Sequence, residues 1–123
     1  MFKLMLMAGV GGFVGTCCRF LINRLFLSFW KLPFPMATFI INILGCLAFG
    51  LLGGWLQKSG LLQPKLNALL IVGFCGGFTT FSTFSFESLS LGMNGEVFIS
   101  FLYIALSIIL GLLATWLGMI VSS

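Results

Sequence analysis

A segment in which glycine, hydroxyl and phenylalanine residues alternate carries the side chains best suited to chemistry. It runs from Gly73 to Glu87, reads GFCGGFTTFSTFSFE, and lies inside a long apolar run. Lipid cannot hydrogen bond to freed backbone groups, so irregular backbone inside a membrane must be covered by protein or line a polar cavity. Interrupted membrane helices often form ion or substrate sites. We therefore predict a helix that is broken near Gly76–Thr80. We interpret this segment as the functional site of the chain.

Two phenylalanine rings follow the predicted break on one helix face. Phe81 and Phe84 are three residues apart, which makes them neighbours on the helix surface. The edge of an aromatic ring is weakly positive, because the quadrupole places negative charge on the faces. A ring edge can therefore face an anion where an ammonium group would hold it too firmly to leave. The polar residues beside the rings are Ser82 and a track spaced four residues apart that ends in a carboxylate, formed by Thr79, Thr83 and Glu87.

Two other apolar runs each carry a polar pair spaced four residues apart. Thr38 and Asn42 form one pair, and Tyr103 and Ser107 form the other, so each pair shares a helix face. For Asn42, an ordinary hydrogen bond between helices is the alternative to a pore role. Together the stripes offer hydrogen-bond donors without a strong fixed positive charge. Such groups suit a small, strongly hydrated anion, which needs donors to replace its water.

Backbone carbonyls and one arginine add further candidate groups. Carbonyls freed at Gly76 and Thr79 must be satisfied. A hard cation such as sodium suits carbonyl oxygens, and the sequence leaves open whether hydrogen bonds between helices satisfy them instead. Arg19 lies deep in the first apolar run, where a charge is costly unless it snorkels or faces water. We interpret it either as a snorkelling anchor or as a vestibule residue at the mouth of an anion path.

The composition is that of an integral membrane protein. The chain is 60% hydrophobic and 7% charged, with a mean hydropathy of +1.23. A typical soluble domain is about 45–50% apolar and about 25% charged. The net charge of +4 comes from basic residues that, apart from Arg19, lie near the ends of the apolar runs. This distribution is typical of segments that flank membrane spans rather than of a nucleic-acid-binding surface.

Four apolar runs are each long enough for a spanning helix, which needs about 20 residues. Turn-forming residues separate them, among them Pro33 and Pro35, which end one helix and favour the start of the next. The first run continues without a cleavage site, so we interpret it as a retained span. We predict an all-α membrane protein with one domain over residues 1–123 and transmembrane helices at about 4–27, 36–56, 66–91 and 97–121.

The basic residues give almost no preference for one orientation in the membrane. Three lie on the N-terminal side of the predicted spans and two or three on the other side. They are Lys3, Lys58 and Lys65 against Arg24, Lys31 and, if it snorkels, Arg19. The positive-inside rule therefore permits insertion both ways, which is compatible with an antiparallel dimer. Because a four-helix subunit packs side chains along its centre and leaves no channel, we favour a homodimer.

The chain lacks the side chains of most metal and enzyme sites. It has no histidine, and no nucleophile–base pair is visible, which argues against an enzyme. The four cysteines, which we interpret as small apolar packing residues, are Cys17, Cys18, Cys46 and Cys75. A small multidrug-type proton-coupled antiporter is the alternative to a channel, with Glu87 as its candidate titratable group. A structural subunit without transport is a third possibility.

The run from Gly73 to Glu87 resembles the signature of the fluoride channel family called CrcB or Fluc. The similarity extends to Gly11–Gly15 followed by Arg19, and to Pro35–Gly45 in the second apolar run. The resemblance implies a dual-topology, antiparallel homodimer in the bacterial inner membrane, with two fluoride pores along the subunit interface. The implied role is passive export of fluoride, which protects the cell from fluoride trapped after hydrogen fluoride enters.

The resemblance also implies roles for individual residues. Phe81 and Phe84 would be the ring-edge residues of the fluoride path, and Asn42 would be a pore donor. The carbonyls of Gly76 and Thr79 would hold a structural sodium ion at the two-fold axis of the dimer. Further pore-lining groups would be Thr38, Ser82, Thr83, Tyr103 and Ser107, with Glu87 near one end. In the family pattern a further hydroxyl follows one turn beyond Ser107, where this chain has Gly111.

Overall fold

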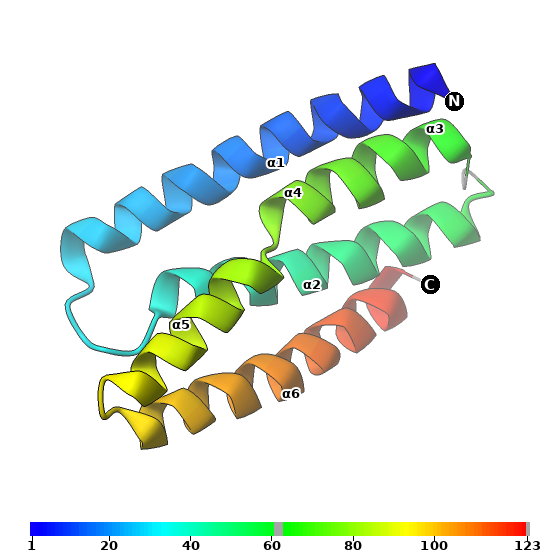
Figure 1. Ribbon diagram of the computed structural model, residues 1–123. Helices are drawn as coiled ribbons and strands as arrows, with labels where there is room; N and C mark the ends of the chain where they lie inside the picture. The colour runs from blue at the N-terminus through cyan, green and yellow to red at the C-terminus, as the bar shows by residue number, and fades with distance from the viewer. Residues whose placement is uncertain (61–62, 123) are drawn as a thin grey trace.

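The computed structural model describes residues 1–60 and 63–122 and has four helices long and apolar enough to cross a membrane. These helices span Phe2–Phe29, Met36–Lys58, Pro64–Met93 and Val97–Ser122. They run back and forth, so both termini lie at one end of the molecule (Figure 1). The prediction of an all-helical protein with four membrane-spanning helices is confirmed.

Three of the four spans are continuous helices. They are α1 (Phe2–Phe29), α2 (Met36–Lys58) and α6 (Val97–Ser122). Helix α2 begins directly after Pro35, whose ring cannot continue a preceding helix. The turn between the third span and α6 contains Gly95 at a φ of 86°, a left-handed conformation that glycine adopts without steric cost.

The third span is divided into several parts. It begins with α3 (Pro64–Leu66), continues as the π-helical segment η1 (Asn67–Cys75) and ends its first half with α4 (Gly76–Phe78). Thr79 and Thr80 then adopt extended backbone conformations, and α5 (Phe81–Met93) forms the second half. The predicted break is therefore present, and it lies at the end of the stretch that the sequence indicated.

The position of the break corrects two details of the sequence interpretation. The Gly76-Gly77 pair is helical, so the glycines precede the break and do not form it. The predicted track from Thr79 through Thr83 to Glu87 assumes one continuous helix, whereas Thr79 lies outside both α4 and α5. Only Thr83 and Glu87 share a helix, because the extended backbone interrupts the 3.6-residue period.

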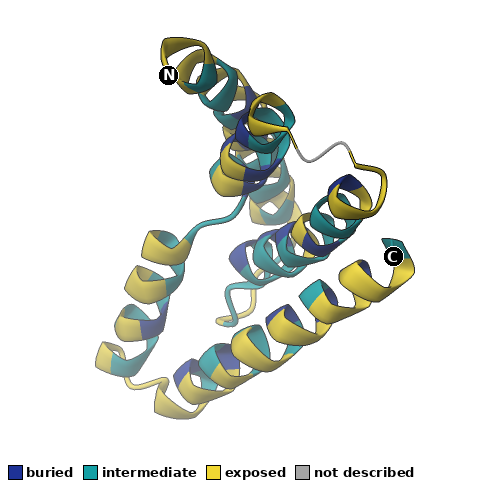
Figure 2. Cartoon of the chain, turned by 90° about the vertical axis from the view of Figure 1, so that its right-hand side faces the viewer, coloured by how far each residue is buried: buried dark blue, intermediate teal, exposed yellow. Residues whose placement is uncertain are grey.

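The third span packs against different helices before and after the break. Its first half, η1 and α4, packs along α1, and its second half, α5, packs against α6. Helix α2 packs along most of α6 and meets the third span near the break. Figures 1 and 2 both show α5 diverging from α1 after the break. The break thus lies among α1, α2 and the two halves of the third span.

Glycines allow the closest helix contacts. On α1, the GxxxG pair Gly11 and Gly15 lies directly against the third span, where added Cβ atoms would overlap the carbonyl oxygens of Leu69 and Phe74. Between α2 and α6, a Cβ at Gly118 would come within 2.7 Å of the Leu47 carbonyl oxygen. Small residues are favoured at such interfaces because dispersion contacts between closely spaced backbones drive helix association in lipid.

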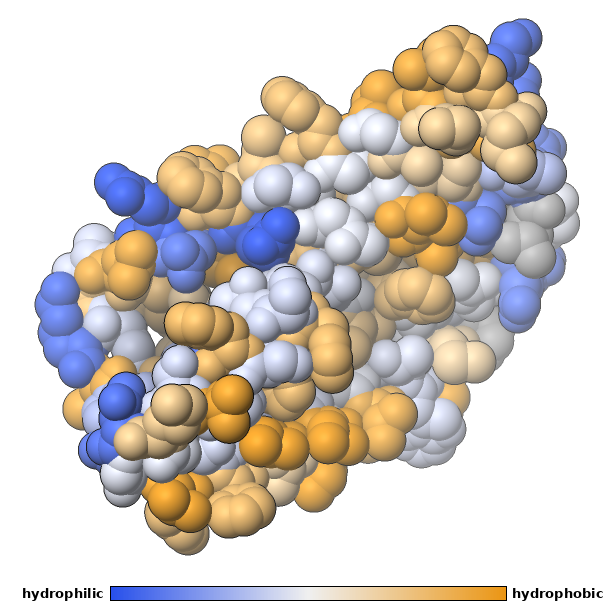
Figure 3. Space-filling model, viewed as in Figure 1, coloured by the Kyte–Doolittle hydropathy of each residue, from blue (hydrophilic) through white to orange (hydrophobic). Residues whose placement is uncertain are grey.

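The molecular surface matches a membrane setting. Large apolar side chains cover the outward faces of α1 and α6, which are mostly exposed (yellow in Figure 2). On the face seen in Figure 3, hydrophilic residues gather mainly toward the two ends of the bundle, and one hydrophilic group reaches toward the middle. Because exposed apolar side chains are costly in water and favourable in lipid, the chain is a multi-pass membrane protein.

Candidate functional site

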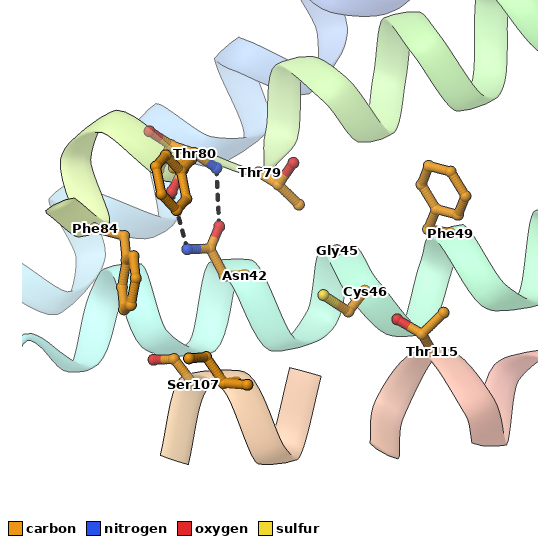
Figure 4. A pocket seen from close by; sticks show the side chains of 11 residues that line it. Asn42, Gly45, Cys46, Phe49, Thr79, Thr80, Phe84, Ser107 and Thr115 are labelled. Atoms are coloured by element: carbon orange, nitrogen blue, oxygen red, sulfur yellow. Dashed lines mark hydrogen bonds between the residues drawn. The ribbon is translucent and has the colours of Figure 1, made fainter. Parts of the chain in front are cut away.

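Asn42 on α2 binds the backbone at the break. Its Nδ2 group donates to the Thr80 carbonyl at 3.0 Å, and its Oδ1 atom accepts from the Thr80 amide at 2.8 Å (Figure 4). The two bonds fix the orientation of the side-chain amide. The hydrogen bond between helices that the sequence left as one alternative for Asn42 is therefore present.

Other side chains satisfy polar groups around the break. The Thr79 hydroxyl donates to the Cys75 carbonyl at 2.9 Å. The Thr80 hydroxyl accepts from the Thr83 amide at 3.2 Å, which is a typical N-cap interaction at the start of α5. The exposed Ser82 hydroxyl lies beside this cap, with its oxygen 3.5 Å from that of Thr80. The break is thus a defined structure held by specific hydrogen bonds.

Arg19 also contacts the break. Its Nε group donates to the Gly77 carbonyl at 3.0 Å, across 58 positions of sequence. Gly77 lies in the last turn before the break, where helix carbonyls lack helical donors. A cation is favourable there, because the carbonyl end of a helix carries partial negative charge. This contact gives Arg19 a backbone partner on the third span.

A cleft of about 480 Å³ extends from the break along α2 and α6. Asn42, Thr79, Thr80, Phe84 and Ser107 line the part near the break, as Figure 4 shows. The remaining lining residues are Gly45, Cys46, Phe49, Phe81, Ile108 and Thr115. Its walls are therefore mainly apolar, with isolated amide and hydroxyl groups.

Two features of this cleft favour an interaction with a polar guest. The Ser107 Oγ atom is buried and has no hydrogen-bond partner within residues 1–60 and 63–122. The rings of Phe81 and Phe84 lie 5.9 Å apart between centroids, and Phe81 is 78% exposed. The cleft thus combines two adjacent rings with a buried hydroxyl in its wall that has no partner among the described residues.

A buried polar cluster lies farther along α5 and α6. The Tyr103 hydroxyl donates to Glu87 Oε1 at 3.0 Å, and Tyr103 is fully buried. Thr38, which is also buried, interacts with both groups. Phe84 connects the cluster to the cleft, because its ring centroid lies 5.1 Å from that of Tyr103. Glu87 also lines a separate pocket of about 230 Å³ near Pro33 and Asn94.

A smaller polar pocket of about 160 Å³ lies on the α1 side of the break. Its polar lining includes Arg19 and Asn23 from α1, Thr38 from α2, and Thr80 and Thr83 from the third span. Its other lining residues are Thr16, Phe20 and Ile41. Thr80 lines both this pocket and the larger cleft, so the two hollows meet the break from different directions.

The carbonyls of Gly76 and Thr79 fit part of a cation site. In a continuous helix the Thr80 amide would donate to Gly76, but here it donates to Asn42. No hydrogen bond to the Thr79 carbonyl forms within the described parts of the chain. Hard cations prefer oxygen ligands and bind several at once. One chain supplies two such oxygens, so the donor set fits a hard cation when a second copy supplies more.

The structure brings together the predicted site residues in two groups. Asn42, Phe81, Phe84 and Ser107 share the cleft, while Thr38, Glu87 and Tyr103 form the buried cluster. Thr80, Asn23 and Thr115 are lining residues without a role in the sequence interpretation. A signal existed for two of them, because Asn23 lies four residues after Arg19, and Thr115 lies eight after Ser107. Thr115 thus continues the α6 stripe past Gly111.

Known proteins resemble this chain over nearly its whole length. A family model described as CrcB-like protein, Camphor Resistance (CrcB), matches residues 6–119. A relative from Flavobacterium psychrophilum, named Fluoride-specific ion channel FluC, is 43% identical over 120 residues, which cover 98% of this chain and 97% of the relative. Relatives with the same name from Methylobacillus flagellatus and Chlorobium phaeobacteroides are 44% and 43% identical over 96% of this chain, and the matches cover 92% and 91% of those proteins.

Proposed function

Because this chain belongs to the CrcB family, we propose that it is a fluoride-selective ion channel that passively exports fluoride from the bacterial cytoplasm and so limits its toxicity. The observation that carries this proposal is the 43% identity, over 98% of the chain, to a protein named as a fluoride-specific ion channel. The comparisons favour this function over the small multidrug-type antiporter. The relatives are named as channels, and the activity is transport across the inner membrane rather than an enzymatic reaction.

The cleft beside the break is the proposed fluoride path. Fluoride is small and strongly hydrated, so it enters only where donors replace its water. Asn42 has a second Nδ2 hydrogen beyond the one used by Thr80, and the Ser107 hydroxyl is unused in the described structure. The edges of Phe81 and Phe84, which line the same cleft, add weakly positive surface. Each group is a weak ligand, which favours passage over retention.

The remaining predicted residues extend the proposed path. The Thr38–Glu87–Tyr103 cluster would form one end, because Phe84 packs against Tyr103. Arg19 would be a vestibule residue, since it lines the polar pocket on the other side of Thr80 and its charge attracts anions toward the break. Ser82 and Thr83 would supply further hydroxyls at the start of α5.

A second copy of the chain would complete the path. The cleft is open along one side, and Phe81 is exposed there, so one subunit does not enclose an ion. We propose an antiparallel homodimer of dual topology, in which each subunit covers the cleft of the other and two pathways result. The nearly even division of basic residues between the two ends supports insertion in both orientations.

A structural sodium ion is proposed at the two-fold axis of this dimer. The carbonyls of Gly76 and Thr79 from each subunit would provide its oxygen ligands, which is the ligand type that hard cations prefer. When bound, the ion would neutralise the partial negative charge at the ends of the two α4 segments and link the subunits. The exposed position of Gly76 supports access from a second copy.

Fluoride efflux from liposomes that contain the purified protein tests the proposal. A fluoride electrode should record rapid release when potassium permeability is supplied, and a matched chloride electrode should record none. An imposed pH gradient distinguishes the antiporter, because proton-coupled exchange would respond to it with an uphill substrate flux. Absence of fluoride release from folded, monodisperse protein would contradict the channel function.

A further inference from the structure

The side chain of Asn42 forms hydrogen bonds with the backbone of the break. Both of its bonds go to Thr80, one to the amide and one to the carbonyl, at 2.8 and 3.0 Å. No side-chain atom of Thr80 takes part in either bond. An interaction of this kind depends on the path of the main chain and is independent of the identity of residue 80.

The bond to the Thr80 amide determines the state of the Gly76 carbonyl. That amide is the donor which would close the helical bond to Gly76 if α4 continued by one more residue. Asn42 accepts it instead, and Thr80 lies in the extended region at a φ of −149°. Asn42 therefore competes directly with helix continuation at this point.

Two other carbonyls before the break, those of Cys75 and Gly77, already have partners. The Cys75 carbonyl accepts from the Thr79 amide at 3.0 Å and from the Thr79 hydroxyl at 2.9 Å. The Gly77 carbonyl accepts from Arg19. The donors around the break thus bind other acceptors, and the carbonyls of Gly76 and Thr79 stay available.

We propose that Asn42 is a positioning residue for the cation site: by binding both backbone groups of Thr80, it holds the third span broken and keeps the Gly76 and Thr79 carbonyls available to sodium. This role is additional to the pore-donor role of Asn42, and it rests on the sodium site in the proposed function. With both roles, the Asn42 side chain would connect the proposed ion path with the cation site at the centre of the dimer.

Loss of fluoride flux cannot distinguish the two roles, so the test measures the response of stability to sodium. The full chain is purified in detergent, and its unfolding temperature is followed while sodium chloride replaces N-methyl-D-glucamine chloride at constant ionic strength. An ion that binds only the folded state raises this temperature as its concentration passes its dissociation constant. For Asn42→Ala, we expect the sodium midpoint to rise about 10- to 100-fold, as for other residues that orient metal ligands.

Two matched variants control for effects of lower stability or altered ion flux on the sodium midpoint. Thr80→Ala keeps the backbone groups that Asn42 binds but removes the hydroxyl that caps α5, so it weakens the break locally. Phe84→Ile alters the ion path without touching the break backbone. Both should keep the wild-type sodium midpoint, although their stability or flux falls. An Asn42→Ala protein with the wild-type midpoint would overturn the proposal.

The outcomes also separate this inference from the channel function. Wild-type protein that conducts fluoride but shows no sodium response would overturn the cation site and this role of Asn42, and would leave the channel function standing. If Asn42→Ala does not fold, Asn42→Asp provides the second measurement. It keeps an acceptor for the Thr80 amide but loses the donor to the carbonyl. Hydrogen exchange of peptides that contain Thr80 should then show partial loss of protection, and unchanged protection would contradict the inference.

Discussion

At the scale of single residues, the proposed fluoride path combines groups that would each hold an anion weakly. The side-chain amide of Asn42 has two N–H donors, and the bond to Thr80 uses one of them. The Ser107 hydroxyl is buried without a partner in the described residues, and burial of an unpaired polar group costs about 1–3 kcal/mol. A guest that accepts a hydrogen bond from Ser107 would recover this free energy. The unpaired Ser107 donor would thus offset part of the desolvation cost that the apolar walls impose on an ion.

Replacement of Phe84 by Ile tests the ring edges. Ile retains apolar bulk but has no quadrupole, so the interaction with an anion is lost while most packing remains. We expect fluoride efflux to fall roughly five- to tenfold, the effect of about 1 kcal/mol in the barrier. Phe98→Ile is the matched control, because Phe98 is 76% exposed in the first turn of α6. Equal efflux from both variants and wild type would refute a role for the ring edge.

A double-mutant cycle tests the bond between Tyr103 and Glu87. Tyr103→Phe removes the hydroxyl that donates to Oε1 at 3.0 Å but keeps the ring that packs against Phe34 and Phe84. Unfolding in mixed micelles should show a loss of about 1.5–3 kcal/mol, the range for hydrogen bonds to charged groups. In the Glu87→Gln background the same change should have a smaller effect. Strictly additive losses would show that the bond does not stabilise the protein.

At the scale of helices, the contact between α1 and the third span depends on two glycines. Gly15 lies so close to the backbone near Phe74 that an added Cβ would also come within 2.9 Å of the Phe78 amide nitrogen. Backbone atoms cannot move aside as the end of a flexible side chain can. The helices would have to separate, which would also pull Arg19 away from the Gly77 carbonyl.

Gly15→Ala should therefore destabilise the protein by about 1–3 kcal/mol, the usual effect of overpacking. Gly9→Ala on the same helix is the control, because nothing lies within 4 Å of its added Cβ. That change should be neutral or stabilising by about 0.5–1 kcal/mol, since alanine favours a helix interior over glycine. Reversible unfolding in mixed micelles measures both. A larger loss for Gly9→Ala than for Gly15→Ala would contradict the packing argument.

The sequence predicts the helices and the broken segment, because hydropathy and glycine content depend on local composition. It does not predict which residues form the break. Gly76 and Gly77 remain helical, and the extended residues are Thr79 and Thr80. The Thr80 backbone is bound by Asn42, a residue 38 positions away. Helical periodicity therefore failed between Thr79 and Thr83. The position of the break depends on this contact between segments that are distant in the sequence. No local sequence pattern contains that information.

At the scale of the whole molecule, charge is almost evenly divided between the two ends. Three lysines lie near the end of the molecule that holds both termini. A similar number of basic residues lies at or toward the other end. The positive-inside rule then gives neither orientation a clear advantage. An antiparallel dimer needs both orientations in one membrane, so its formation depends on this balance.

A change in the charge balance tests the antiparallel dimer. Asn94→Lys with Glu96→Lys adds positive charge to the turn before α6, and Gln57→Lys with Ser59→Lys adds it at the opposite end. All four positions are exposed, so folding should be preserved. Each variant should insert in one orientation, opposite to that of the other, as a C-terminal topology reporter would show. Expressed alone, each should lose fluoride efflux, because an antiparallel pair cannot form.

Co-expression of the two oppositely biased variants should restore efflux, since each then meets a partner of the other orientation. The neutral changes Asn94→Gln with Glu96→Gln provide the control for disturbance of the turn and should retain efflux. Full efflux from one variant that the reporter shows in a single orientation would mean that a parallel pair or a single subunit conducts. In that case the open side of the cleft beside Phe81 must be closed by something other than an inverted copy.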